Sequence, residues 1–396
     1  MKYKTYKIKD LINEISMGPF GSNIKVECFV DSGIPVLNGS NLTGFALNDN
    51  SFRYVTPEKA DSLGKANAYR GDIVITHRGT LGQIVFIPEN SKHSRYVISQ
   101  SQFRVKCNEK ILPEYLVYYF HTNAGQHKLL SNASQVGVPA LARASTTFQT
   151  LEIDIPDVTE QRKIVDLLET IREKIELNNA INNNLEQQAK ALYKDWFFDF
   201  TPFSTDGNLP DGWRLGTVND IIQLHDSKRV PLSGAERDKM AKIYPYYGAT
   251  SLMDYVDNYL FDGIYLLLGE DGTVVDSLGF PILQYVYGQF WVNNHAHIIT
   301  GNEGFSVEEL YLFFSLTNIK SIVTGAVQQK VSQQNLKKVP AIIPSKDALS
   351  AFDELIQPIF SQIRNLRDEN ARLADLRDTL LPKLMSGELD VSDIDL

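Results

Sequence analysis

Apolar residues recur at alternating steps of four and three in two long stretches of the chain. The first stretch runs from about Thr159 to Asp199 and the second from Asp347 to Met385, at an offset of 188 residues (352 − 164). This spacing is typical of helices that pair along one apolar seam, as in a coiled coil. The predicted seam positions are Ile164, Leu168, Ile171, Ile175, Asn178, Asn182, Leu185, Ala189, Leu192 and Trp196 in the first helix, and Phe352, Ile356, Ile359, Ile363, Leu366, Asn370, Leu373, Arg377, Leu380 and Leu384 in the second.

Two amphipathic helices packed on separate domain cores would show a similar pattern. Length favours the coiled coil, because globular helices average about 11–12 residues and these stretches are about three times longer. Each helix also has a polar layer near its middle, which costs stability but fixes the register. An antiparallel pair would place Asn178 opposite Asn370 and a parallel pair would place Asn182 there, so both directions stay open.

The segments outside these helices read as mixed helix and sheet. Short apolar runs predict strands at 72–76, 84–87, 102–105 and 151–155, and again at 264–268, 282–286, 296–299 and 339–343. A helix packed on the sheet is expected at 113–121 and at 307–315. We therefore predict the α+β class, with two pseudo-repeated α/β domains (1–158 and 201–346) separated by a long coiled coil of two helices (159–200 and 347–396).

Internal repetition supports this division. Residues 108–120 return as 302–314, Ile34-Pro35 matches Tyr244-Pro245, and Gly79 and Gly82 match Gly269 and Gly272. The matches keep their order while their offset changes, which indicates two copies that differ by insertions in loops. A chain of this kind can present two similar surfaces.

Composition adds looser limits. Cys28 and Cys107 form no CxxC pair and cannot build a zinc site, which favours a reducing compartment. The first residues lack the apolar run of a secretory signal, and no apolar stretch approaches the ~20 residues of a membrane span. We therefore expect a cytoplasmic protein without membrane contact.

Charge argues against a strong stand-alone nucleic-acid binder. The net charge is −9, and Lys plus Arg minus Asp plus Glu gives +3 for residues 1–158 (17 − 14) and −4 for 201–346 (11 − 15). Affinity for duplex DNA comes largely from neutralised phosphates. If the protein binds DNA, we expect a basic partner to supply much of the affinity.

Catalytic and metal-binding motifs are missing from the sequence. There is no GxxxxGK, GxGxxG, HExxH or GxSxG motif, and the nearest approach to the Asn/Asp-Pro-Pro-Tyr/Phe tetrad of adenine methyltransferases is Tyr244-Pro-Tyr-Tyr247. His295 and His297 would share one strand face without a third ligand nearby, so we interpret them as structural. Asp157 and Glu160 fit an ordinary helix N-terminus. We predict no catalytic residue and no metal site.

Polar loops at matching places in the two copies are the remaining candidates for function. Arginine pairs well with guanine, and asparagine or glutamine with adenine, in the major groove. Taken singly, each of these residues could be ordinary loop polarity, but their side chains differ between the copies as two different reading surfaces would require. The candidate DNA-binding residues are Thr76, His77, Arg78, Thr80, Gln83, Gln100, Gln102, Gln135 and Arg143 in the first copy, and Asn293, Asn294, Gln328, Gln329, Lys330 and Gln333 in the second.

Several segments, in order along the chain, resemble the specificity subunits of type I restriction–modification systems. They are Gly18-Pro-Phe-Gly-Ser22, Ile34-Pro-Val-Leu, Arg78-Gly-Thr-Leu-Gly82, Val136-Gly-Val-Pro139, Ile155-Pro-Asp-Val-Thr-Glu-Gln-Arg-Lys-Ile164, Leu209-Pro-Asp-Gly-Trp213 and Leu384-Met-Ser-Gly-Glu388. The second helix entry, 346–352, departs from the family pattern.

The resemblance implies a subunit without catalysis of its own. Two target-recognition domains would each read one half of a bipartite site in double-stranded DNA, held apart by an antiparallel coiled coil of the family's two conserved helices. Two methyltransferase (modification) subunits would dock on these helices, and restriction (translocase and nuclease) subunits would complete the complex. S-adenosylmethionine, ATP and Mg²⁺ would bind to these partners and no cofactor to this chain.

One function of another class fits the same pattern. The duplicated domains could bind proteins, with the coiled coil as a spacer, in a non-catalytic scaffold. The acidic charge favours that alternative slightly, whereas the family segments favour DNA recognition.

Overall fold

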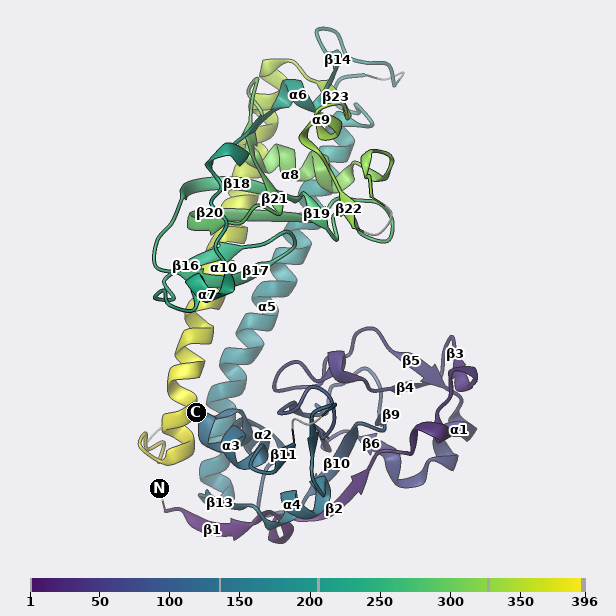
Figure 1. Ribbon diagram of the computed structural model, residues 1–396, viewed down its shortest axis with the longest axis vertical. Helices are drawn as coiled ribbons and strands as arrows, with labels where there is room; N and C mark the ends of the chain where they lie inside the picture. Colours follow the sequence, from purple (N-terminus) through teal and green to yellow (C-terminus); the bar gives the residue numbers. More distant parts are fainter. Residues whose placement is uncertain (1, 135–136, 205–206, 326–327, 393–396) are drawn as a thin grey trace. The chain divides into compact units, whose positions relative to one another are not determined.

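The computed structural model describes residues 2–134, 137–204, 207–325 and 328–392 (Figure 1). The chain divides into two compact units: unit 1 comprises Met1–Glu176 with Asn370–Leu396, and unit 2 comprises Leu177–Glu369. The boundary falls inside both long helices, α5 (Val158–Phe197) and α10 (Lys346–Ser386). Each unit therefore contains one segment of each long helix.

Unit 1 is built around a four-stranded sheet, in the order β2-β10-β7-β8, and a five-stranded sheet, in the order β3-β5-β4-β9-β6. Two further strand pairs, β1-β13 and β11-β12, lie outside these sheets. The strands are β1 (Lys4–Lys7), β2 (Ile12–Met17), β3 (Phe29–Val30), β4 (Ile34–Val36), β5 (Arg53–Val55), β6 (Asn67–Tyr69), β7 (Ile73–Thr76), β8 (Ile84–Phe86), β9 (Arg95–Val97), β10 (Gln102–Cys107), β11 (Ala133–Ser134), β12 (Ala140–Leu141) and β13 (Glu152–Ile155). The shorter helices are α1 (Pro57–Ser62), α2 (Pro113–His121), α3 (Asn123–Leu129) and α4 (Ala144–Thr150).

Unit 2 is built around a six-stranded sheet, in the order β15-β21-β18-β20-β16-β17, with the pairs β14-β23 and β19-β22 outside it. The strands are β14 (Arg214–Thr217), β15 (Ile222–Leu224), β16 (Tyr244–Tyr247), β17 (Leu252–Val256), β18 (Phe261–Gly269), β19 (Asp271–Gly272), β20 (Leu283–Val292), β21 (Ala296–Gly301), β22 (Gln329–Lys330) and β23 (Pro340–Ile343). The shorter helices are α6 (Val218–Ile221), α7 (Gly234–Arg237), α8 (Val307–Leu316) and α9 (Gln333–Leu336).

The central strand of each unit is buried on both faces. In unit 1, Ile73 and Ile75 of β7 pack in the core under α2, and Val74 packs in a second core on the opposite face. In unit 2, Leu266 and Leu268 of β18 pack in the core under α8, and Leu267 in another. A strand buried on both faces gives a continuous apolar run, which is the signal that predicted both strands from sequence.

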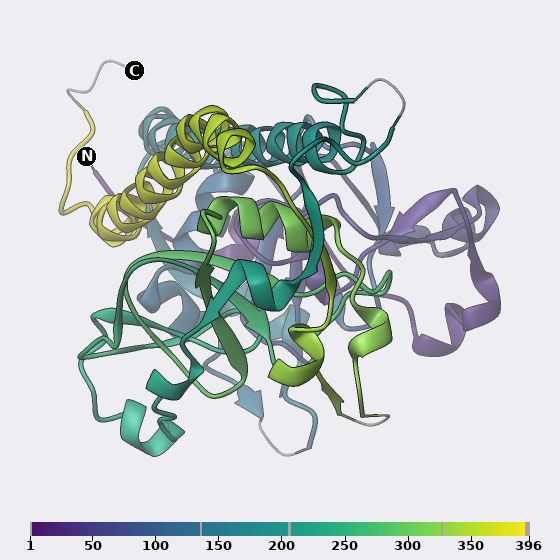
Figure 2. The same cartoon turned by 90° about the horizontal axis from the view of Figure 1, so that it is seen from above.

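The predicted helices at 113–121 and 307–315 are α2 and α8, and each packs on its sheet as expected. Seen from above, α8 lies between the sheet of unit 2 and the long helices (Figure 2). Tyr311 of α8 donates a hydrogen bond to Glu186 of α5 and packs on Phe360 of α10. The α+β class predicted from sequence is confirmed.

Within unit 2 the long helices run antiparallel. The rings of Trp196 and Phe352 are 5.3 Å apart, and Asn178 donates a 2.8 Å hydrogen bond to Glu369. Residue numbers therefore rise along one helix as they fall along the other, which decides the direction that the sequence left open. Within unit 1, the start of α5 and the end of α10 share one core that contains Ile164, Leu168 and Leu384.

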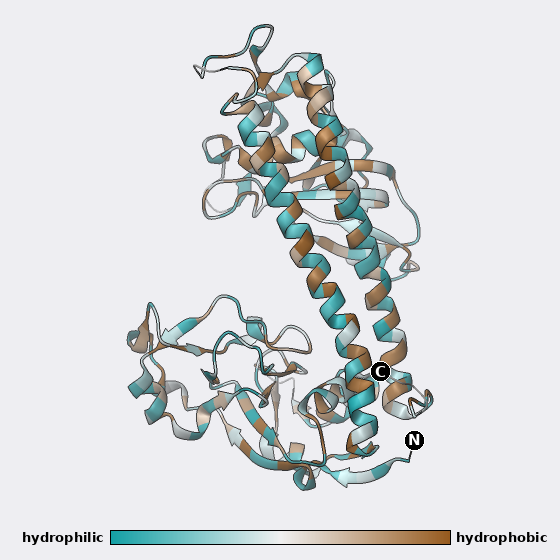
Figure 3. Cartoon of the chain, turned by 180° about the vertical axis from the view of Figure 1, so that it is seen from behind, coloured by the Kyte–Doolittle hydropathy of each residue, from teal (hydrophilic) through white to brown (hydrophobic). Residues whose placement is uncertain are grey.

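Both interpretations of the heptad pattern describe part of the packing. Apolar residues alternate with polar ones along both helices (Figure 3). Every predicted seam position from Ile164 to Trp196 and from Phe352 to Leu384 is buried or half-buried. Phe352, Ile356 and Ile363 also belong to the core of unit 2, so the helices pack on the unit as well as on each other.

Helix α8 carries a buried carboxyl group. Glu309 is fully buried, and one of its oxygens accepts a 2.8 Å hydrogen bond from the Ser306 N–H at the helix start. The other oxygen has no hydrogen-bond partner among the described residues. Burial, reinforced by the charges of Asp353 and Glu308, raises the pKa of Glu309 to about 8 against hydrogen bonds from Ser306 that lower it. The folded protein therefore holds a proton there at pH 7.

We expect Glu309→Gln to stabilise the protein in alkaline solution. A carboxyl whose pKa is raised on folding contributes its full stability only below the pKa of the unfolded chain, 4.5. This stability is lost as the pH rises toward the folded pKa of about 8. Thermal unfolding should give similar Tm values for variant and parent at pH 4.5, and a higher Tm for the variant at pH 8.5. The matched control, Glu354→Gln at an exposed position of α10, should show no such pH-dependent difference. Parallel Tm profiles for Glu309→Gln and its parent would contradict the assignment.

Candidate nucleic-acid interface

Three loops meet at one end of the four-stranded sheet of unit 1. In the turn after β7, the carbonyl of His77 accepts a hydrogen bond from the Leu141 N–H (2.9 Å). The His77 N–H donates to the carbonyl of Ser101 (2.8 Å), in the turn before β10. Arg78 also forms an antiparallel bridge with Ala140. The loops that carry the first set of candidate residues are therefore held together by their backbones.

The same backbone pattern recurs in unit 2. The Val331 N–H bonds to the Glu270 carbonyl (2.8 Å), and the Glu270 N–H bonds to the His295 carbonyl (2.8 Å). Asp271 pairs with Lys330 as Arg78 pairs with Ala140. The loops that carry the second set of candidate residues thus meet in the same way.

These contacts correct one detail of the sequence repeat. His77 corresponds to Glu270, so Gly79 corresponds to Gly272 and not to Gly269. Both glycines adopt a left-handed conformation, with φ of +93° for Gly79 and +92° for Gly272, which side chains rarely tolerate. The alignment by glycine spacing alone was wrong by three residues.

Exposure separates the candidate residues of unit 1 into two groups. Arg78, Thr80, Gln100 and Arg143 are exposed, and neither arginine makes an ion pair with the described residues. Thr76 and Gln102 are buried: Thr76 bonds to Gln83 (2.9 Å), and Gln102 accepts the Ser99 N–H (2.8 Å).

Two more candidates of unit 1 are half-buried links between loops. Gln83 donates to the Gly39 carbonyl (2.9 Å), and a His77 ring nitrogen lies 3.1 Å from the Gln100 carbonyl. Partial burial lowers the pKa of His77, which favours its neutral form. Gln135 lies outside the described residues.

The exposed candidates of unit 2 are amides and one lysine. Asn294, Gln328, Lys330 and Gln333 are exposed and Gln329 is half-buried. Asn293 is buried and accepts the His295 N–H (2.8 Å), so it shapes the turn between β20 and β21.

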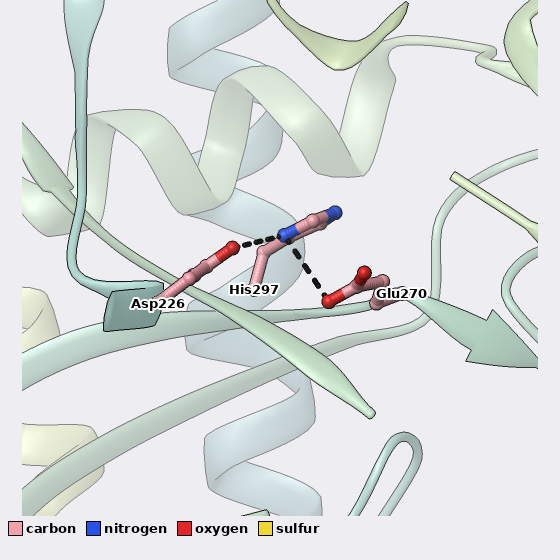
Figure 4. A group of neighbouring side chains, drawn as sticks. All are labelled: Asp226, Glu270 and His297. Atoms are coloured by element: carbon pink, nitrogen blue, oxygen red, sulfur yellow. Dashed lines mark hydrogen bonds and ion pairs between the residues drawn. The ribbon is translucent and has the colours of Figure 1, made fainter. Parts of the chain in front are cut away.

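A buried polar group ties the three loops of unit 2 together (Figure 4). His297 of β21 lies 2.6 Å from Asp226 through one ring nitrogen and 2.8 Å from the Val331 carbonyl through the other. The imidazole therefore links the Asp226 carboxylate to the backbone carbonyl of Val331. Asp226 also accepts hydrogen bonds from Gln333 (2.6 Å) and from the Ile298 N–H (2.9 Å).

Arg229 completes this group. It donates to Glu270 (2.6 Å) and to the Ala296 carbonyl (2.8 Å), and it lies 3.6 Å from Asp226. Burial alone would raise the pKa of Asp226, but its hydrogen bonds with His297, Ile298 and Gln333 hold that pKa below the ordinary range. Asp226, Glu270 and His297 lie close enough to ligate a metal ion, but internal cations already neutralise both carboxylates. The arrangement is an ion-pair network that fixes loops.

Sequence reasoning missed most of this network. His297 was identified as structural, whereas Asp226, Arg229 and Glu270 carried no signal, since Asp226 lies 71 residues from His297. In unit 1 the equivalent positions, from the strand registers, are Met17, His77 and Phe103. The two loop sets therefore share their backbone frame and differ in what supports it.

Comparison with known proteins decides what these units are. A family model described as the type I restriction modification DNA specificity domain matches residues 2–187 and 210–375. The chain belongs to this family. It is a type I specificity subunit with two target-recognition domains and is not itself catalytic.

Two relatives show how far the similarity extends. The MjaIX specificity subunit of Methanocaldococcus jannaschii is 26% identical, over 98% of this chain and 94% of its own. The HindI specificity subunit of Haemophilus influenzae is 24% identical, over 88% of this chain and 93% of its own. The crystal structure of the S subunit from M. genitalium shares the fold, with a TM-score of 0.56, 15% identity and coverage of 97% and 96% of the two chains.

As a member of a type I system, this specificity subunit recognises DNA and assembles with other subunits. Among its described residues, no helix combines the length and apolar character that a membrane span needs.

We expect Asp226→Asn to loosen the loops of unit 2. Removing the carboxylate of a buried ion pair leaves Arg229 undercompensated and weakens the hydrogen bond to His297, at a cost of about 3 kcal/mol or more of unfolding free energy. In cells that carry the whole system, the half of the methylated motif read by unit 2 should become less specific or less methylated. The half read by unit 1 should stay unchanged. Asp262→Asn, at an exposed position of β18, is the matched control. An unchanged motif and unchanged Tm in the Asp226 variant would show that the network does not position the loops.

Proposed function

We propose that the recognition domains, residues 1–158 and 201–346, each read one half of a bipartite site in double-stranded DNA. The three-loop ends of the two units are the reading surfaces. One observation carries this proposal: both units hold three loops by the same backbone hydrogen bonds, while the exposed side chains on these loops differ. A shared frame with different side chains suits two readers of different sequence.

The chemistry of each surface favours a different base. Unit 1 exposes Arg78 and Arg143 without ion-pair partners among the described residues, and arginine pairs with guanine through two hydrogen bonds. Unit 2 exposes Asn294 and Gln328, and such amides pair with adenine, whereas the amide of the exposed Gln333 donates to Asp226. The buried Thr76, Gln102 and Asn293 support the loops from beneath.

The partners follow from the family and the charge. Two methyltransferase subunits dock on the helices of residues 159–200 and 347–396 and supply much of the phosphate contact that a chain of net charge −9 lacks. Restriction subunits join this assembly. S-adenosylmethionine, ATP and Mg²⁺ bind to these partners, which carry the chemistry in the cytoplasm.

Replacing residues 1–158 with the equivalent domain of a relative tests the two-reader proposal. One half of the methylated motif should change and the other should stay, as measured by methylome sequencing of cells with the whole system. Arg78→Gln should affect that same half alone, since each lost base contact costs on the order of 1–3 kcal/mol. The control is Lys65→Gln, which removes a positive charge from an exposed position outside the three loops. A change of both halves by either alteration would contradict separate readers.

We further propose that the helices set the distance between the half-sites. Inserting one full heptad at equivalent layers of both helices preserves the seam and lengthens it by about 10 Å. The spacer of the methylated motif should grow by roughly three base pairs, at ~3.4 Å each, with both half-sites unchanged. Inserting three or four residues into one helix alone should disrupt the seam and abolish methylation. An active heptad variant with an unchanged spacer would show that something else sets the distance.

A further inference from the structure

A tightly clamped turn in unit 1 presents an aromatic ring to solvent. The turn Gly18–Gly21 follows β2, and the Gly18 N–H bonds to the Gln102 carbonyl (2.8 Å). A Cβ on Gly18 would lie 1.9 Å from the Ser99 carbonyl oxygen, and one on Gly21 would lie 2.2 Å from the Gln100 side chain. Gly18 is therefore needed for the turn to approach the 99–102 backbone this closely, whereas a side chain at position 21 would displace the flexible Gln100 amide.

Phe20 is the exposed aromatic residue of this turn. Its backbone carbonyl accepts the Asn23 N–H (2.8 Å), while its side chain is 82% exposed. The clamped backbone thus fixes where the ring stands.

Beside Phe20 lies an open cleft of about 350 Å³, which we call the Phe20 cleft. Its apolar wall includes Phe20, Ile24 and Phe29, and its polar groups include Asn38, Arg53 and Gln100. Apolar walls with a few convergent polar groups are typical of sites that hold a flat ligand in one orientation.

The Phe20 cleft is continuous with the three-loop surface of unit 1. Gln100 lines the cleft, and its carbonyl lies 3.1 Å from the ring of His77 in the loop after β7. Gln83, from the same loop, donates to the carbonyl of Gly39, next to the cleft residue Asn38. If these loops read a duplex, a base next to the ones they contact would therefore lie at the cleft.

The charge beside the cleft also favours DNA as its occupant. The guanidinium of Arg53 lies 5.2 Å from the centre of the Phe29 ring and makes no ion pair with the described residues. An exposed arginine held by stacking and left without a carboxylate is complementary to a phosphate.

We propose that the Phe20 cleft is the apolar part of the reading surface of unit 1. The Phe20 ring packs against a base of the half-site that unit 1 reads, and Arg53 neutralises the phosphate next to that base. This inference rests on the proposed function, because it requires unit 1 to read DNA. Apolar side chains that contact thymine methyl groups or wedge against base steps supply such contacts in other DNA-binding proteins.

The test uses the full chain assembled with its methyltransferase subunits. Phe20→Ala, Arg53→Gln and the control Val26→Ala, an 81% exposed apolar residue on the same segment, are each titrated with two duplexes. One duplex carries the motif found by methylome sequencing, and in the other the half read by unit 1 is scrambled. Gel filtration without DNA measures assembly.

Phe20→Ala should weaken binding to the motif duplex by on the order of tenfold and leave binding to the scrambled duplex and assembly unchanged. Arg53→Gln should weaken binding to both duplexes and reduce the slope of log affinity against log salt by about 1. Val26→Ala should behave as the parent.

Three results would overturn the inference. If Phe20→Ala binds the motif duplex with parental affinity, or loses equal affinity for both duplexes, Phe20 makes no contact with a base of the half-site. Loss of assembly without DNA would make Phe20 a contact to the methyltransferase subunit. If replacing residues 1–158 shifts the motif but Phe20→Ala has parental affinity, the cleft inference alone fails; if that replacement shifts nothing, the proposed function fails.

To distinguish a thymine methyl from an unstacked base face, thymines of the motif are replaced singly by uracil, and adenines by 2-aminopurine. Loss of the Phe20 effect with one uracil identifies a methyl contact. A Phe20-dependent rise in 2-aminopurine fluorescence identifies an unstacked base.

Discussion

Backbone hydrogen bonds at the end of each central strand are the constraint on which both candidate reading surfaces depend. The residue after β7, His77, and the residue after β18, Glu270, each receive an N–H from a hairpin and donate their own N–H to the turn before β10 or β21. Main-chain groups make these bonds, so they place no demand on side-chain identity. The loops can therefore differ in their exposed residues without losing their arrangement, as they do between the two units.

Beneath this shared frame the two units differ. Unit 2 supports its loops with the buried charges of Asp226, Glu270, His297 and Arg229, whereas unit 1 has Met17, His77 and Phe103 at the corresponding strand positions. At its three loops, unit 2 therefore pairs Arg229 and Lys330 with Glu270, and most of the exposed candidate residues there are amides. Unit 1 leaves Arg53, Arg78 and Arg143 available on its surface.

The long helices serve two packing interactions at once. Their seam positions are buried or half-buried, and some of the same residues, such as Phe352 and Ile356, complete the core of unit 2. A heptad pattern detects the apolar stripe but does not reveal what covers it, because a partner helix and a sheet-bound helix both bury such a stripe. The two interpretations are therefore not exclusive, because the same helices pair with each other and pack on the core of unit 2.

Local periodicity determined most of what the sequence alone could establish. The helices α2, α5, α8 and α10, the buried strands β7 and β18 and the duplication all follow from patterns within short windows, where side-chain alternation reflects burial directly. The strands of the five-stranded sheet have two or three residues each, too few to show a period of two, so that sheet escaped prediction. Only the tertiary structure decided the equivalence of Gly79 with Gly272, the grouping of Asp226 with His297 across 71 residues, and the clamped turn that exposes Phe20. Each of these depends on strand register and on close approach between distant segments, and no local pattern of residue types encodes them.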